Sequence, residues 1–298
     1  MKRIAFLGPE GTVSQESSLC FLGDKEYEFV SYPQMYDVFT ATVNGETDFS
    51  VIPIENAIDG SVSLHVDLLV NEFNLPILAE WVYPSIQNLI GYKQDLLPES
   101  TGSPYAGISK IYSIPVATSQ CYKFLRANIP GVQSEGVSST AKGVQIVKER
   151  GESEGPGGFA AIGTRLAAKL HGLDILAENI TDHQNNYTRF VLVGSQTPAL
   201  RPSEKLKTTI VVTLPEDFPG ALHQVLSAFA WRRINLSKIE SRPTKLKLGS
   251  YYFYIDVEGS LDSVLLPAAI AEIEALGCQV RALGSYPCYD YDAIKAEA

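Results

Sequence analysis

Short apolar runs and longer amphipathic stretches alternate along residues 1–195. The apolar runs, bounded by turn residues, predict strands at Lys2–Leu7, Phe49–Pro53, Leu75–Val82, Gln87–Gly91 and Phe190–Val193. The amphipathic stretches predict helices at Thr12–Leu22, Gln34–Asn44, Ser61–Asn71, Ser119–Asn128, Ser139–Glu149 and Thr164–His171. A glycine-rich loop is expected at Gly151–Gly158. This alternation is typical of an α/β domain, in which helices wrap a parallel or mixed sheet.

A different pattern follows a proline-containing linker at residues 196–205. Strands are expected at Thr208–Leu214, Asn235–Glu240, Tyr251–Glu258 and Gln279–Ser285, and helices after Pro219-Gly220 and within Ser263–Leu276. The first of these helices has apolar residues at i, i+3, i+4 and i+7, namely Leu222, Val225, Leu226 and Phe229. The order βαββαβ predicts a ferredoxin-like domain at residues 206–287, followed by a tail at residues 288–298.

Composition narrows the class of protein. With 298 residues, of which 45% are hydrophobic and 19% charged, the chain is expected to be globular with two or three domains. Its net charge of −10 argues against a nucleic-acid partner. The four cysteines and four histidines are scattered, which predicts no metal site, and free thiols suit a reducing compartment. No apolar run reaches the length of a membrane span or a signal peptide, so we expect a cytoplasmic protein without a membrane partner.

Polar turns stand between several strands and the helices after them, where ligands collect in open α/β sheets. The turn Gly8-Pro9-Glu10-Gly11-Thr12 either presents backbone amides to an anion or simply redirects the chain, with Thr12 as a helix N-cap. Glu55 and Asn56 are candidate pocket residues, or else belong to a polar loop before a helix capped by Ser61. Ser138–Ala141 offers the same choice between helix capping and carboxylate binding.

An arginine stands at the start of the apolar strand near residue 190, in Thr188-Arg189-Phe190. Its guanidinium either clamps a carboxylate in a bidentate manner or holds the strand in place as an ordinary charge. Taken together, these turns suit a small polyanion held in a cleft between two lobes.

Several of these segments are motifs of a single family. In the first part they are Gly8-Pro9-Glu10-Gly11-Thr12, Pro53-Ile54-Glu55-Asn56 with Gly60, Ser139-Thr140-Ala141, Ala161-Ile162-Gly163, and Asn186 with Thr188-Arg189-Phe190. In the second part they are Gly220-Ala221-Leu222, Glu240-Ser241-Arg242-Pro243 and Gly284-Ser285-Tyr286-Pro287. By these motifs the chain resembles, over nearly its whole length, the prephenate dehydratases that carry a C-terminal ACT domain.

The resemblance implies an α/β protein with a two-lobed, periplasmic-binding-protein-like catalytic domain at residues 1–195 and a ferredoxin-like ACT domain at residues 206–287. It implies the decarboxylating dehydration of prephenate to phenylpyruvate in phenylalanine biosynthesis, without a cofactor. The catalytic residues that it implies are Thr188, Arg189, Glu55 and Asn56. The substrate-binding residues that it implies are Gly11, Thr12, Ser139, Thr140, Asn186 and Phe190.

The resemblance also implies regulation by L-phenylalanine, bound between paired ACT domains. The effector-binding residues that it implies are Gly220, Ala221, Leu222, Glu240, Ser241, Arg242 and Pro243. A site between paired domains requires a homo-oligomer, and we expect a dimer or a tetramer.

The chain departs from the family pattern at Val13, Ala57, Ile114 and Val116, whereas Gln120 and Cys121 persist. Ile114 stands where many members have a histidine, so no histidine donates a proton at that position. Three other interpretations stay open from the sequence. These are an enzyme that prefers arogenate, a non-catalytic solute-binding protein, and a phenylalanine sensor with a decayed catalytic cleft.

Overall fold

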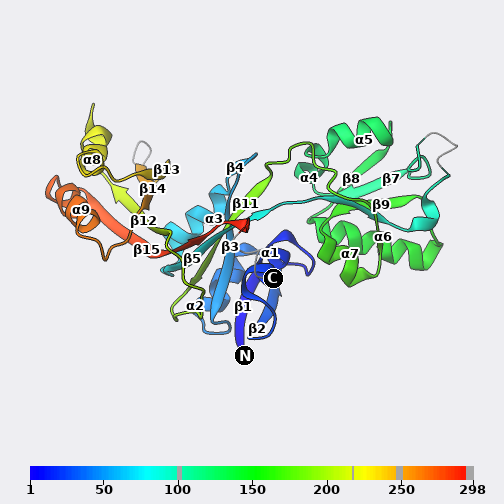
Figure 1. Cartoon of the computed structure of the whole chain (residues 1–298), viewed down its shortest axis with the longest axis horizontal. Helices are drawn as coiled ribbons and strands as arrows, with labels where there is room; N and C mark the ends of the chain where they lie inside the picture. Colours follow the sequence, from blue (N-terminus) through cyan, green and yellow to red (C-terminus); the bar gives the residue numbers. More distant parts are fainter. Residues whose placement is uncertain (99–102, 217, 246–250, 293–298) are drawn as a thin grey trace. The chain divides into compact units, whose positions relative to one another are not determined.

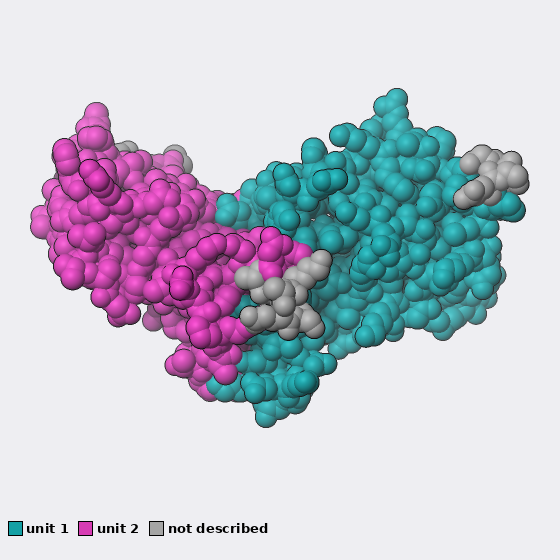
Figure 2. All heavy atoms as spheres, viewed as in Figure 1, with its two compact units in different colours: residues 1–38, 55–60, 83–188 teal, residues 39–54, 61–82, 189–298 magenta. Residues whose placement is uncertain are grey.

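A computed structural model describes residues 1–98, 103–216, 218–245 and 251–292 (Figure 1). The last six residues of the expected C-terminal tail, 293–298, lie outside the described residues. The chain divides into two compact units, unit 1 with residues 1–38, 55–60 and 83–188, and unit 2 with residues 39–54, 61–82 and 189–298 (Figure 2). Three of the five boundaries fall within strands β3 (Phe49–Asn56), β5 (Ile77–Pro84) and β11 (Tyr187–Gly194), and the other two fall within α2 (Met35–Val43) and β4 (Gly60–Ser61).

Unit 1 contains two groups of strands. Strand β1 (Lys2–Leu7) pairs in parallel with β2 (Tyr27–Tyr32), and α1 (Val13–Leu22) connects them. A five-stranded sheet has the order β10-β6-β9-β7-β8. Its strands are β6 (Asn88–Gly91), β7 (Lys110–Ser113), β8 (Gln133–Gly136), β9 (Phe159–Gly163) and β10 (Asp174–Ala177). Strand β7 is parallel to both neighbours, whereas β6 is antiparallel to both of its own, so the sheet is mixed.

Helices cover both faces of this sheet. On one face lie α4 (Pro115–Ser119) and α5 (Tyr122–Asn128), and on the other α6 (Thr140–Glu154) and α7 (Arg165–His171). Successive residues of a strand point to opposite faces. Accordingly, Leu89 and Ile162 join the cluster under α4 and α5, while Ile90 and Ala161 join the cluster under α6 and α7. Helix α6 approaches β7 so closely at Gly143 that an added Cβ would stand 2.6 Å from the carbonyl oxygen of Tyr112.

Unit 2 is built on strands in the order β13-β14-β12-β15-β5-β11-β3, with β4 (Gly60–Ser61) beside β3. Its C-terminal strands are β12 (Leu206–Thr213), β13 (Leu236–Pro243), β14 (Tyr251–Glu258) and β15 (Gln279–Tyr289). Its helices are the greater part of α2 (Met35–Val43), then α3 (Ser63–Asp67), a π-helical turn at Leu68–Glu72, α8 (Ala221–Ala230) and α9 (Leu265–Ala275). The end of β15 pairs in parallel with β5 through Cys288 and Tyr289, and this pairing joins the C-terminal strands to the others.

The ferredoxin-like order βαββαβ is confirmed for the C-terminal part. Each pair of neighbouring strands among β12 to β15 is antiparallel, and α8 and α9 pack on one face of them. Val225 and Phe229, from the i, i+3, i+4, i+7 stripe of α8, are buried against Ile210 and Ile255. Leu222 and Leu226 of the stripe are only half-buried, and Ala228 joins the core, so the apolar periodicity identified the core face of α8 in part.

Some elements differ from those expected. The helix expected at Ser119–Asn128 is divided at Gln120 and Cys121 into α4 and α5, and α4 begins at Pro115, a residue type favoured in the first helical turn. Strand β8 was not predicted because all four of its residues, Gln133–Gly136, are exposed at the sheet edge and show no apolar pattern. Among the described residues, no helix is both long and apolar enough to cross a bilayer.

A buried ionic cluster fixes the start of β11 within unit 2. Nη1 of Arg189 lies 2.5 Å from Oδ2 of Asp256 and 3.3 Å from Oε2 of Glu80. Thr209 donates to the other oxygen of Asp256 at 2.6 Å, and Lys207 pairs with the other oxygen of Glu80. Removing one partner from a buried ion pair is costly because a desolvated charge remains without compensation.

We expect Asp256→Ala to lower the free energy of unfolding of unit 2 by about 3–5 kcal/mol. The measurement is urea unfolding followed by fluorescence in a Trp231→Phe background. Both tryptophans belong to unit 2, and Trp81 is buried whereas Trp231 is 81% exposed, so the signal then reports burial of Trp81.

The control is Asp290→Ala, which removes the exposed ion pair with Lys205 in the same unit and should cost less than about 1 kcal/mol. Equal losses in the two variants would contradict a special role for the buried cluster.

Candidate active site

Hydrogen-bonded polar side chains surround Thr188 in unit 1. Nδ2 of Asn56 donates to Oγ1 of Thr188 at 3.0 Å and to Oδ1 of Asn186 at 2.9 Å. Oγ of Ser85 lies 2.6 Å from Oγ1 of Thr188. Nδ2 of Asn186 donates to Oε1 of Gln120 at 2.9 Å and to the carbonyl oxygen of Ser85 at 3.2 Å. We call these residues, together with Asp59, the Thr188 network.

The direction of the hydrogen bonds in this network is set by Asp59, which lies at its outer end. The carboxylate of Asp59 only accepts, so the amide of Gln120 turns Nε2 toward it, at 2.7 Å. Oε1 of Gln120 must then accept from Asn186, whose Oδ1 in turn accepts from Asn56. The amide of Asn56 is therefore oriented with Nδ2 inward, and Oγ1 of Thr188 is an acceptor at that contact.

The backbone independently supports this orientation of Asn56. Its Oδ1 accepts from the amides of Ile58 and Asp59 at 2.9 and 3.0 Å, the local turn that asparagine commonly makes after a strand. Main-chain bonds then bring the segments together, because the amide of Ala57 donates to the carbonyl of Tyr187 and that of Ser85 to the carbonyl of Asn186, both at 2.8 Å.

The network contains hydroxyl and amide groups, and Asp59 is its one ionisable member. Asn186 and Ser85 are buried, with 4% and 7% exposure. Next to Gln120, burial raises the pKa of the Cys121 thiol to about 12, so this thiol is not a nucleophile at neutral pH. The arrangement suits hydrogen bonding to a departing oxygen rather than covalent catalysis.

The glycine-containing turn before α1 contacts the start of α7. The amide of Gly11 donates to Oε1 of Gln15 at 2.6 Å, and its carbonyl accepts from Oγ1 of Thr164 at 2.7 Å. Gly11 has φ of +86°, and an added Cβ would stand 2.9 Å from Cα of Ala167, so only glycine fits. Thr12 donates to the carbonyl of Leu7 and makes no side-chain capping bond. The backbone amide of Gly11 is thus used within the turn.

The other sequence-predicted residues fall into different surroundings. Ser139 caps α6 by accepting from the amide of Lys142 at 3.0 Å, and Thr140 is the buried first residue of that helix. Phe190 is buried in unit 2, where its ring stacks on Trp81 with centroids 5.8 Å apart. Glu55 precedes Asn56 at the end of β3.

Arg189, expected among the catalytic residues as a carboxylate clamp, has its guanidinium in the buried ionic cluster with Glu80 and Asp256. This position corresponds to the alternative in which the arginine holds the strand. Of the two residues, Thr188 and Arg189, the structure brings only Thr188 into the network.

Sequence reasoning did not select Ser85 or Asp59. Ser85 follows Pro84 in a short gap between β5 and β6, and a lone serine there gives no signal of its role. Gln120 was noted only as a position that persists from the family pattern. Contacts between residues more than sixty positions apart in the chain, such as Gln120 with Asp59 or Ser85 with Thr188, require the fold.

The effector motifs lie in the ferredoxin-like part of unit 2. Strands β12 and β13 both run antiparallel to β14, so they run in the same direction and end on the same side. Helix α8 begins after β12, at Gly220, which has φ of +95° and forms its N-terminal cap position. The motif Glu240–Pro243 ends β13, so both motifs lie at one end of this part.

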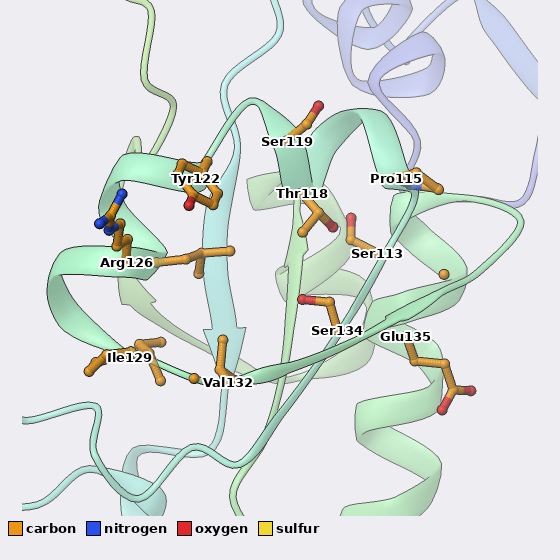
Figure 3. A pocket seen from close by; sticks show the side chains of 14 residues that line it. Ser113, Pro115, Thr118, Ser119, Tyr122, Arg126, Ile129, Val132, Ser134 and Glu135 are labelled. Atoms are coloured by element: carbon orange, nitrogen blue, oxygen red, sulfur yellow. The ribbon is translucent and has the colours of Figure 1, made fainter.

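A pocket of about 790 Å³ opens in unit 1 between α4, α5 and strands β7 and β8 (Figure 3). Leu125, Ile129 and Val132 give it apolar walls, and Ser113 and Thr118 contribute hydroxyls. Among the described residues, its lining shares no member with the Thr188 network, although Ser119 directly precedes Gln120.

Comparisons with known proteins identify the families that the two parts of the chain match. The family model for prephenate dehydratase matches residues 4–198, and the model for the ACT domain matches residues 208–277. The prephenate dehydratase of Bacillus subtilis (strain 168) is 41% identical over 294 residues, covering 96% of this chain and 99% of that protein.

Solved structures share the fold. The prephenate dehydratase of Arthrobacter aurescens in complex with L-Phe superimposes with a TM-score of 0.82 at 32% identity, covering 96% of this chain and 89% of that one. A protein described as a novel type of quorum-quenching acylase, GqqA, superimposes with a TM-score of 0.80 at 26% identity, covering 96% and 98%.

Fold and matches together define an enzyme of the hydro-lyase class that carries a C-terminal ACT domain. The predicted fold class is confirmed. The chain belongs to the prephenate dehydratase family.

The four departures from the family pattern have definite places in unit 1, and Val13 is the first residue of α1. The other three lie near α4 or after β3. Ile114 packs its side chain on the apolar cluster under α4 and α5, so it serves the core. Val116 is 46% exposed on α4, and Ala57 is exposed in the turn after Asn56. None of the three contributes a side chain to the hydrogen bonds described for the Thr188 network.

Burial raises the pKa of Glu16 above 4.5, against hydrogen bonds from the Leu166 amide and the Tyr83 side chain that lower it. The folded state therefore binds this proton more tightly than the unfolded chain does. The stabilisation of the folded state by protonated Glu16 is fully present below pH 4.5. This stabilisation is lost as the pH rises through the raised pKa of the folded state. We expect Glu16→Gln, which keeps an acceptor for Leu166, to remove this loss.

The measurement is the thermal unfolding midpoint of the wild type and Glu16→Gln between pH 5 and pH 7.5. The unfolding midpoint of Glu16→Gln minus that of the wild type should increase by about 2 °C or more from pH 5 to pH 7.5. Glu149→Gln, at an exposed carboxyl on α6, serves as the control and should show no such trend. A constant difference between Glu16→Gln and the wild type would contradict the raised pKa.

Proposed function

We propose that this protein converts prephenate to phenylpyruvate, water and carbon dioxide, with the hydroxyl of Thr188 assisting the departing hydroxyl of the substrate. The observation that carries this proposal is the position of Thr188 at the inner end of an oriented chain of amides in a member of the prephenate dehydratase family.

The reaction requires little covalent chemistry from the protein. Breaking the bond to the carboxyl carbon releases carbon dioxide and supplies an electron pair to the ring, and the hydroxyl at the opposite ring position leaves with the bonding electrons. The ring becomes aromatic, and the hydroxyl takes up a proton to leave as water. The enzyme must hold the substrate and donate to the leaving oxygen.

Thr188 is suited to donate because Asn56 already occupies one of its lone pairs. A hydroxyl has one proton and two lone pairs, so a donor at one lone pair leaves the proton for another partner. Threonine is a weak acid, and we propose that it gives a hydrogen bond to the leaving oxygen, directly or through a water molecule.

We expect Thr188→Ala to lower kcat on prephenate by about 10²–10⁴-fold, the usual range for general-acid assistance, and Thr188→Ser to keep most of the activity. The measurement is phenylpyruvate formation by the purified variants. Full activity of Thr188→Ala would exclude the proposed role.

The same assay addresses the alternatives. Turnover of arogenate with none of prephenate would indicate the aminated substrate. Binding of prephenate without turnover of either would favour a decayed cleft or a solute-binding protein.

For the remaining residues expected in the site, Glu55, Asn56 and Asn186 are supported by their position in or beside the network. Gly11, Thr12, Ser139 and Thr140 are proposed to shape the site through the turn before α1 and the start of α6. Arg189 and Phe190 are proposed to stabilise β11 within unit 2.

We further propose that L-phenylalanine binds at Gly220–Leu222 and Glu240–Pro243 and inhibits the reaction. Support comes from the family member crystallised with L-Phe and from the common end of the domain at which the two motifs lie. Such coupling between sites is commonly worth about 1–3 kcal/mol.

The side chains of β13 divide this motif between two faces. Within unit 2, Ser61 donates to Oε2 of Glu240 at 2.6 Å, and Nη2 of Arg242 lies 2.9 Å from Oδ1 of Asp67. Ser241 and Pro243 alternate with these residues and are exposed. Ligand-facing atoms of the motif are therefore expected from Ser241 and the adjoining backbone.

We expect Gly220→Ala to weaken inhibition by phenylalanine at least about 5-fold, since alanine strains the left-handed backbone that begins α8. The measurement is the phenylalanine concentration for half-inhibition, with calorimetric binding in parallel. The control is Gly259→Ala, also at positive φ but after β14, at the other end of the domain. Equal weakening in both variants would argue against an effector site at Gly220.

Pairing of ACT domains would make the protein a homo-oligomer, and we propose a dimer or a tetramer. Exposed apolar side chains on this part of unit 2 support an interface, among them Trp231, Ile239, Tyr251 and Leu265. We also propose a cytoplasmic location, which the four free cysteines suit.

A further inference from the structure

We propose that Ser85 is a positioning residue that donates its hydroxyl proton to Oγ1 of Thr188 during turnover. The inference rests on the proposed function of Thr188. Its motivation is the 2.6 Å separation of the two hydroxyl oxygens, which is short enough that one must donate to the other.

The oriented amides decide which hydroxyl donates once substrate is present. Oγ1 of Thr188 already accepts from Asn56, so it has one proton and one lone pair left. If Thr188 donated to Ser85, it would have no proton for the leaving oxygen of the substrate. When Ser85 donates instead, both lone pairs of Thr188 are occupied, and its proton can point only in the remaining tetrahedral direction.

Two donors also make Thr188 a better acid. As the proton moves toward the leaving oxygen, negative charge grows on Oγ1, and hydrogen bonds from Asn56 and Ser85 strengthen with that charge. They do so without reorganising, because Ser85 is only 7% exposed and its backbone is held from both sides by Asn186. The atom balance is unchanged, since Ser85 shares its proton and does not lose it.

This role separates Ser85 from the residues that shape the turn. Its main chain performs the structural task, because its amide donates to the carbonyl of Asn186 and its carbonyl accepts from the Asn186 side chain. Replacing serine with alanine keeps both of these bonds and removes one oxygen atom.

We expect Ser85→Ala to lower kcat on prephenate about 10- to 100-fold while KM changes less than about 3-fold. The decisive measurement is a double-mutant cycle. In a Thr188→Ala background, adding Ser85→Ala should cause no further loss, because the hydroxyl that Ser85 serves is absent. Ser18→Ala, which removes a buried hydroxyl bonded to the carbonyl of Ser14 in α1, is the matched control and should retain wild-type kcat.

The outcomes are distinct. Wild-type kcat in Ser85→Ala, or losses that multiply in the double variant, would overturn this inference and leave the role of Thr188 standing. A loss in Ser85→Ala confined to KM would also overturn it. Absence of prephenate turnover by the wild-type protein, or full activity of Thr188→Ala, would overturn the proposed function and the role of Ser85 with it.

Discussion

The ionic contact of Arg189 with Asp256 and Glu80 is the constraint on which the arrangement around β11 depends. A buried guanidinium is stable only where carboxylates compensate its charge. Because Glu80 and Asp256 provide this compensation at one place, β11 is held in one register along its own axis. A shift of β11 by one residue would turn every side chain of the strand to the opposite face. Thr188 precedes Arg189 directly in the chain. Thr188 belongs to unit 1 and Arg189 to unit 2, so one peptide bond joins the residue that carries the candidate catalytic hydroxyl to the residue at the centre of the buried ionic cluster.

In the Thr188 network, one charged group orients the donor and acceptor ends of several uncharged side-chain amides. Each amide has a donor end and an acceptor end, and a single carboxylate at Asp59 is enough to orient Gln120, Asn186 and Asn56 in turn. The backbone amides of Ile58 and Asp59 impose the same orientation on Asn56 from the other side. Because two independent constraints agree, the donor reaching Thr188 is set before substrate arrives, which is the property that electrostatic preorganisation requires.

The sequence predicted the parts of this protein in which local pattern and burial coincide. The stripe on α8, the strand β1 and the order βαββαβ follow from apolar periodicity, and the short motifs identified the segments that carry Thr188 and Asn56. Strand β8 was not predicted because an exposed edge strand of polar residues shows no alternation of apolar and polar positions. Arg189 was open to two interpretations because the carboxylates that decide between them, Glu80 and Asp256, are more than sixty residues away in either direction. Ser85 could not be found for the same reason, since its partner Thr188 is 103 positions further along the chain.

The alternation of side chains along β13 has a consequence for the proposed effector site. Glu240 and Arg242 are committed to Ser61 and Asp67, so substitutions there disturb the packing of unit 2 along with any response to an amino acid. Ser241 and Pro243 alternate with these two residues and are exposed on the other face of the strand. At the proposed effector site, substitutions at Ser241 and Pro243 would therefore alter the response to phenylalanine while the contacts of Glu240 and Arg242 are kept. One face of β13 thus carries packing contacts of unit 2, and the other carries the side chains proposed to meet the effector.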